Sequence, residues 1–71
     1  MLTQLDIQLK YDAYSSLAAQ RLLTPPEKAF LLFCQDCHQQ IFDENKPLHS
    51  SITRRATRLF KKIMDYPLLF P

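Results

Sequence analysis

The sequence of 71 residues contains no glycine and no tryptophan, and only two of its residues are cysteines. Without glycine, the chain lacks the glycine-rich loops that hold phosphates and the serine elbow found in many hydrolases. No paired carboxylates and no other catalytic grouping stand out in their place. The sequence therefore predicts a non-catalytic protein that uses no cofactor.

Long apolar runs are also missing. The longest covers residues 29–34, whereas a transmembrane helix needs about 20 apolar residues. The first residues show no basic segment followed by an apolar one, so we expect no secretory signal. Cys34 and Cys37 lie three residues apart, and on one helix their side chains diverge too far for an unstrained disulfide. Free thiols and the lack of a signal predict the reducing cytoplasm.

The short chain predicts one domain that covers residues 1–71. A core of this size supplies roughly 3–5 kcal/mol of stability, so small domains often depend on a disulfide, a metal or a partner. Since the sequence shows no disulfide, we expect the protein to gain stability by self-association, most simply as a homodimer.

The clearest helix start is the sequence TPPE, in which Thr24 and Glu27 match a capping box. The two prolines fit the first helical turn, where their missing N–H groups are not needed. The predicted helix runs from Thr24 to about Glu44, because Pro47 prevents its continuation. In a chain without glycine, Asn45 is the expected residue of positive φ at the helix end.

The apolar residues of this central helix gather on one broad face at about 100° per residue. That face is formed by Phe30, Phe33, Cys34, Cys37 and Ile41. Because so broad a face needs neighbours on two sides, we predict an all-α domain of three helices, with the first and third packed against the second. Leu32 falls on the polar side, so we expect it to contact another copy or a partner.

The N-terminal segment allows two interpretations. We prefer one helix from about Thr3 to Leu23, begun by a capping box between Thr3 and Asp6. The alternative is a short strand over residues 4–11 and a helix from Asp12, because apolar and polar residues alternate in that stretch. Such a strand would form the ribbon that some dimers insert into the DNA major groove. Its outward residues would be Asp6, Gln8 and Lys10.

Residues 50–66 predict a third helix, capped by Ser50 or Ser51 and ended by Pro67. Its apolar face is formed by Ile52, Ala56, Leu59, Phe60 and Ile63, and its opposite face carries Arg54, Arg55, Arg58, Lys61 and Lys62. From residue 45 onward the chain has six basic residues and one acidic residue, whereas the first 44 residues have three basic and six acidic. The basic face could neutralise phosphates or meet an acidic protein, although solvated faces of this kind are common.

One short motif suggests a metal. Cys34, Cys37 and His38 have the spacing of a c-type haem attachment site, but that attachment requires export. A zinc site would take Cys34, Cys37, His38 and His49. Paired zinc ligands usually lie on a turn, however, and buried cysteines behave as small apolar residues. We therefore interpret both cysteines as core residues and expect no metal.

These patterns predict a small interaction or regulatory protein that acts through protein–protein contacts and self-associates. The predicted contact residues are Leu32, Leu68, Leu69 and Phe70. The first alternative is a nucleic-acid-binding protein that uses the basic face of the third helix. The second alternative is a zinc-binding module.

Overall fold

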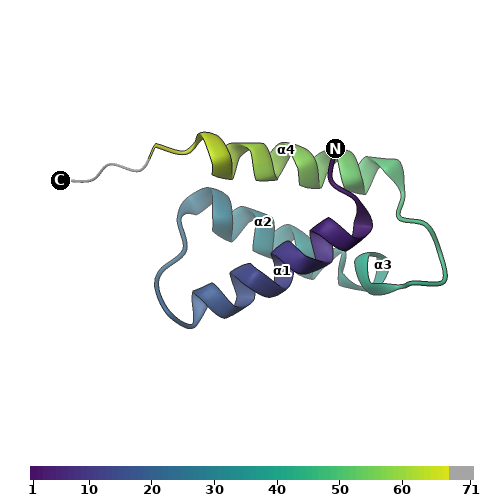
Figure 1. The fold of residues 1–71 in the computed structure, drawn as a ribbon, viewed down its shortest axis with the longest axis horizontal. Helices are drawn as coiled ribbons and strands as arrows, with labels where there is room; N and C mark the ends of the chain where they lie inside the picture. Colours follow the sequence, from purple (N-terminus) through teal and green to yellow (C-terminus); the bar gives the residue numbers. More distant parts are fainter. Residues whose placement is uncertain (68–71) are drawn as a thin grey trace.

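The structure is a computed structural model that describes residues 1–67, and this part of the chain is all-α, without a strand. Its helices are α1 (Gln4–Ala18), α2 (Pro25–Asp36), α3 (His38–Phe42) and α4 (Ser50–Asp65) (Figure 1). None of these helices is long and apolar enough to cross a membrane. The all-α prediction is confirmed, and the strand over residues 4–11 is wrong, as is the DNA-binding ribbon that depended on it. The predicted contacts Leu68, Leu69 and Phe70 lie outside the described residues.

Helix α1 begins at the predicted capping box. The Thr3 hydroxyl accepts the backbone N–H of Asp6 at 3.1 Å, and the Asp6 carboxylate accepts the N–H of Thr3 at 2.9 Å. The bond from the Thr3 N–H to the carboxylate is the largest cause that lowers the pKa of Asp6. The helix ends at Ala18 and not at Leu23 as predicted. A residue that precedes a proline is pushed out of the helical region, and the chain uses the residues before Pro25 to turn into α2.

The central stretch forms two helices, so the described chain has four helices where three were predicted. The TPPE start is as predicted, because the Glu27 carboxylate accepts both the backbone N–H and the hydroxyl of Thr24 at 2.9 Å. The break falls at Cys37, whose φ of −105° and ψ of 20° depart from regular helical values. The N–H of Ile41 still bonds to the carbonyl of Cys37 at 2.9 Å. The chain therefore changes direction at Cys37 while the N–H and the carbonyl of this residue both keep helical partners.

The turn after α3 differs from the prediction at Asn45. No residue of the described chain has a positive φ, so the left-handed conformation predicted for Asn45 is wrong. The Asp43 carboxylate accepts the N–H of Asn45 at 3.0 Å, as in a turn closed by an aspartate side chain. That side chain reverses the chain, so no left-handed residue is needed.

Helix α4 has a different cap from the predicted serines. The Nδ1 atom of His49 accepts the N–H of Ser51 at 3.1 Å and lies 2.7 Å from its hydroxyl oxygen. A neutral imidazole nitrogen can accept in this way, so His49 is the N-cap and Ser50 is the first helical residue. The helix ends at Asp65, shortly before Pro67, close to the predicted end.

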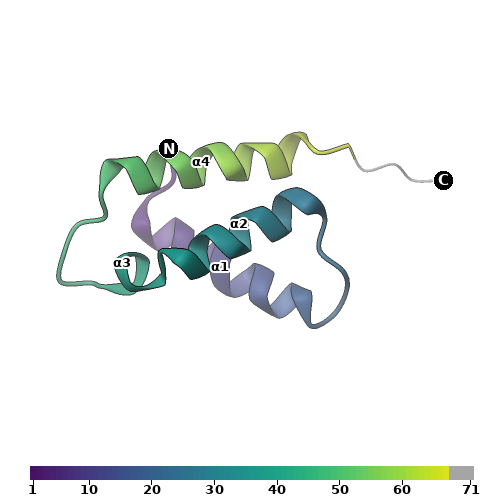
Figure 2. The same ribbon diagram turned by 180° about the vertical axis from the view of Figure 1, so that it is seen from behind.

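Every helix contributes to one small core. The fully buried side chains are Ile7 from α1, Phe30 and Cys34 from α2, Ile41 from α3 and Ala56 from α4. The Phe30 ring meets Tyr14 edge to face with centroids 5.7 Å apart, and Phe60 at 6.4 Å. Helix α2 thus contacts both α1 and α4 (Figure 2).

Candidate interaction surfaces

The four candidate metal ligands each have a separate structural role. Cys34 is fully buried, and burial, with a smaller effect of Cys37, raises the pKa of its thiol to about 12. Cys37 is half-buried at the edge of the same core. His38 stacks on Phe42 with ring centroids 4.5 Å apart, whereas His49 caps α4. Among residues 1–67, no three His, Cys, Asp or Glu side chains gather where they could hold a metal.

The five predicted cations of α4 form a continuous basic face. This basic face consists of Arg54, Arg55, Arg58, Lys61 and Lys62, and all five residues are exposed. In the described chain the only ion pair joins Arg21 to Glu27, so none of the five has an acidic partner there. The Arg55 guanidinium lies 5.4 Å from the centroid of the Phe33 ring. The basic face is therefore not neutralised within residues 1–67.

The basic face is also slightly hollowed. Four of its cations, with Ser51 and half-buried Leu59, line an open depression of about 410 Å³. With a rise of 1.5 Å per residue, the cations from Arg54 to Lys62 extend over about 12 Å of helix. An elongated anion such as a phosphate backbone can meet several of them at once.

A second surface is apolar and lies where α1 turns into α2. We call it the leucine surface, and it is lined by Ala18, Arg21, Leu22, Leu23, Lys28, Leu31, Leu32 and Gln35 around a hollow of about 290 Å³. Leu22 is 93% exposed and Leu32 is 50% exposed. Leu32 was predicted as a contact residue, and it is exposed as its place on the polar side implied. Leu22 was missed, because the longer predicted α1 would have kept it in a helix.

The turn that presents Leu22 is held by hydrogen bonds. Arg21 donates to the carbonyl of Leu22 at 2.8 Å and makes two bonds to the Glu27 carboxylate, at 2.9 and 3.1 Å. Only 6% of Glu27 is exposed, and the bonds from Arg21 lower the pKa of its carboxyl. The same carboxylate caps α2 through Thr24. Leu22 is therefore held in the solvent by a bonded turn and not by a frayed helix end.

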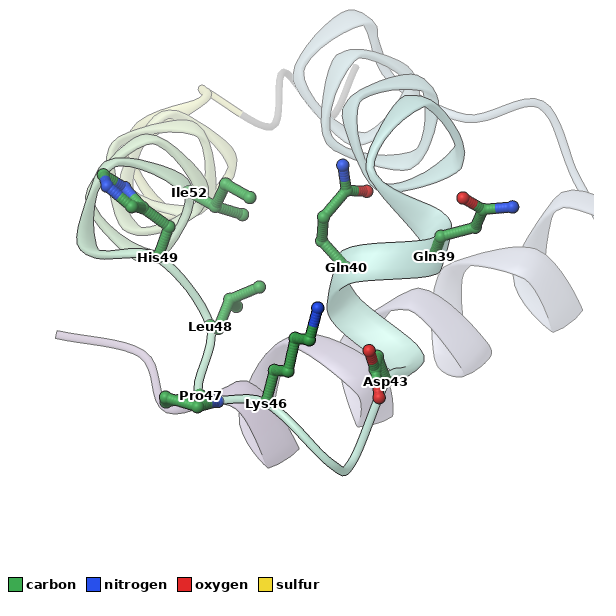
Figure 3. A pocket seen from close by; sticks show the side chains of 8 residues that line it. All are labelled: Gln39, Gln40, Asp43, Lys46, Pro47, Leu48, His49 and Ile52. Atoms are coloured by element: carbon green, nitrogen blue, oxygen red, sulfur yellow. The ribbon is translucent and has the colours of Figure 1, made fainter.

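A third hollow, of about 290 Å³, lies between α3 and the start of α4. In Figure 3 the Lys46 side chain projects between Gln40 and Asp43 on one side and Leu48 on the other. Sequence reasoning did not identify this place. It combines amides, a cation, a carboxylate and apolar side chains, and most of its polar residues are exposed. No single ligand chemistry is favoured by that mixture.

Comparison with known proteins gives no relative from which a role could be transferred. No family model matches the chain, and neither a curated protein nor a solved structure is similar to it. The function must therefore be argued from the two surfaces themselves.

Proposed function

We propose that this protein is a non-catalytic interaction protein that acts through protein–protein contacts and self-associates through the leucine surface. The observation that carries the proposal is the position of Leu22. It is 93% exposed, yet its carbonyl is bonded to Arg21, which is itself bonded to buried Glu27. Leu22, Leu31 and Leu32 line one hollow with Arg21 and Lys28 at its rim, and contiguous exposed apolar surface rimmed by polar residues marks contact sites.

The magnitudes favour association. Full burial of a leucine side chain contributes roughly 1.5–3 kcal/mol, while the core of a domain this small supplies roughly 3–5 kcal/mol. Burying Leu22 and Leu32 against a partner would therefore add an amount comparable to the stability of the domain. The adjoining half-buried residues Leu23 and Leu31 enlarge the apolar area that a partner would cover.

Sedimentation equilibrium of the full chain tests this proposal. We expect self-association that is lost in the double variant L22S/L32S. The matched control is L5S/L9S, because Leu5 and Leu9 are 61% and 58% exposed on α1 but lie outside the leucine surface. Association that survives L22S/L32S and disappears in L5S/L9S would place the contact on α1 and refute the proposal.

The second candidate function is nucleic-acid binding by the basic face. It is favoured because the five cations have no acidic partner within residues 1–67. A helix of about 10–12 Å diameter also fits the major groove of DNA, which is about 12 Å wide. If all five cations displace counterions from the duplex, the logarithm of affinity should fall with the logarithm of salt concentration at a slope of about −4.5.

Fluorescence anisotropy with a labelled DNA duplex, repeated with RNA, tests this candidate. Between about 50 and 200 mM salt, such a slope predicts a roughly 500-fold loss of affinity. The charge reversal R54E/R58E should abolish binding. The control K28E/K46E changes the net charge equally but outside the basic face, so it should retain most of the affinity. An absence of binding at low salt would refute nucleic-acid recognition and leave an acidic protein as the partner of this face.

We also propose the cytoplasm as the compartment. This proposal is supported by the two cysteines, which are both free thiols, because disulfides form readily only in oxidising compartments.

A further inference from the structure

The leucine surface lies at the end of the molecule where α4 also finishes. Figures 1 and 2 both place the C-terminal end of α4 and the turn between α1 and α2 at the same end. Arg21 lines the leucine surface and also lines a neighbouring hollow with Ile63, Met64 and Tyr66 of the α4 end. The sequence continues past Pro67 with Leu68, Leu69 and Phe70. An apolar segment therefore follows directly where an apolar surface is uncovered.

The distances argue against coverage by the same copy. Phe30 meets Phe60 of α4, and Leu32 projects about 200° around α2 from Phe30, so Leu32 faces away from α4. Packed helix axes lie about 8–10 Å apart, and the outer side of α2 adds about 5–6 Å. Three residues span only about 10 Å when fully extended. This length is shorter than the path from the axis of α4 around α2 to Leu32, which favours contact with a second copy.

We propose that Leu68, Leu69 and Phe70 of a second copy occupy the leucine surface. The proposal rests on the self-association proposed above and names the segment that makes the contact. Because the donor segment and the acceptor surface lie at the same end of the molecule, a two-fold axis at that end brings each segment to the other copy's leucine surface. Such a reciprocal exchange about a two-fold axis closes at a dimer.

The leucine surface and the donor segment are chemically complementary. The rim of the leucine surface carries Lys28, and it also carries Arg21, whose charge is paired with Glu27; no acidic side chain lines the surface itself. The donor segment is preceded by exposed Asp65 and contains no basic residue after Lys62. An apolar segment with an acidic residue before it suits an apolar hollow with a cation at its rim.

Two variants and their mixture test the exchange. The segment variant L68S/L69S/F70S leaves residues 1–67 unchanged, and the surface variant L22S/L32S replaces exposed side chains, so both should keep the helical circular dichroism of the parent chain. By native mass spectrometry we expect the parent chain to be dimeric. Each variant alone should raise the dissociation constant of the dimer by roughly 100-fold or more, because each removes several apolar side chains from both contacts.

The mixture is decisive. With one variant labelled by nitrogen-15, the two should form a heterodimer, since the surface variant supplies an intact segment and the segment variant supplies an intact surface. A dimer that survives L68S/L69S/F70S but not L22S/L32S overturns the exchange and leaves the proposed self-association standing. A parent chain that stays monomeric at millimolar concentration overturns both. Two monomeric variants that form no heterodimer up to that concentration overturn the exchange alone.

Discussion

Helices α1 and α4 both pack beside α2, but they use their sequences in opposite ways. Helix α4 turns its apolar side to the core and its cations to water. Helix α1 leaves Leu5 and Leu9 more than half exposed. On its packed side it directs the amides of Gln4 and Gln8 to the carbonyl of Ile41, both at 2.8 Å. Two amide side chains of α1 therefore bond to the end of another helix. On α4 the Thr57 hydroxyl accepts the N–H of Leu2 at 3.0 Å, but within the described residues no cation of the basic face bonds to a helix end.

The difference follows from the end of α3. The last carbonyls of a helix have no partner within it, and α3 ends against α1, where Ile41 is fully buried. Gln4 also donates to the carbonyl of Asp43 at 3.2 Å. Within residues 1–67 the side chains of the basic face cap no helix terminus, so α4 can keep a simple amphipathic pattern. Packing against the end of α3, in addition to the side of α2, explains the irregular pattern of α1.

The largest expected effect is a difference in stability between substitutions on the buried and the exposed sides of α1. Ile7→Ala should lower the free energy of unfolding by about 2–5 kcal/mol, because Ile7 is fully buried and the change leaves a cavity. Leu9→Ala should change it by less than about 0.5 kcal/mol. Urea unfolding followed by circular dichroism measures both. Equal losses of unfolding free energy in the two variants would show that the side of α1 that carries Leu5 and Leu9 is also buried.

The next effect tests the amide contacts of α1. The variant Q4A/Q8A should lose about 1–3 kcal/mol of stability, since the buried end of α3 loses its donors. The control Gln20→Ala removes an exposed glutamine from the turn after α1 and should be nearly neutral. If Q4A/Q8A proves as stable as the control, the contrast drawn between α1 and α4 is wrong.

A smaller effect on stability is expected when a cation in an ion pair is removed, compared with a cation that has no acidic partner in the described chain. Arg21→Ala should destabilise the protein at pH 7, because Glu27 loses its bidentate partner. Arg58→Ala, on the basic face, should not. The folded pKa of Glu27 lies below its ordinary value of 4.5, so the stability it contributes is present above about pH 4.5 and is lost as pH falls through the lower folded pKa.

Acid unfolding curves of the parent chain and of Arg21→Ala measure this effect. The two curves should converge below pH 4 as Glu27 becomes protonated. A difference in stability that stayed constant down to pH 2 would mean that Arg21 acts through packing and not through its ion pair.

The smallest expected effect is a difference in thiol reactivity between Cys34 and Cys37, measured without changing the fold. Cys34 lies on the side of α2 that both helices cover, and its pKa of about 12 makes its thiolate fraction roughly a thousandfold lower than that of a thiol of ordinary pKa. Iodoacetamide at pH 8 should therefore label Cys37 and spare Cys34. Peptide mapping with and without urea distinguishes the two. Equal labelling in the absence of urea would show that α1 and α4 do not close over α2.

Much of the local structure could be predicted from individual residues. The capping pairs Thr3 with Asp6 and Thr24 with Glu27 are where they were expected, because such caps depend on side chains only three residues apart. The break at Cys37 carried no signal, since glycine and proline are absent there. The break depends on what α3 packs against, which no local pattern contains.

The candidate surfaces were predictable to different degrees. The basic face was readable because its residues repeat with the period of one helix. Leu32 could be predicted because it is an apolar residue on the polar side of the predicted central helix. Leu22 was not, because its exposure depends on where α1 ends and on the bonds of Arg21. The exposure of a side chain that depends on a tertiary contact cannot be predicted from the periodicity of the sequence.

The helical class, both capping boxes, the apolar face of α2 and the separation of charge on α4 could be predicted from the chain alone, because each of these follows from interactions within one or two helical turns. Tertiary structure alone decided which half of the alternating residues in α1 faces inward, where the central stretch breaks, and which leucines are left in water. Those outcomes depend on the positions of carbonyls and carboxylates in other helices, and residues distant along the chain bring them together only after folding.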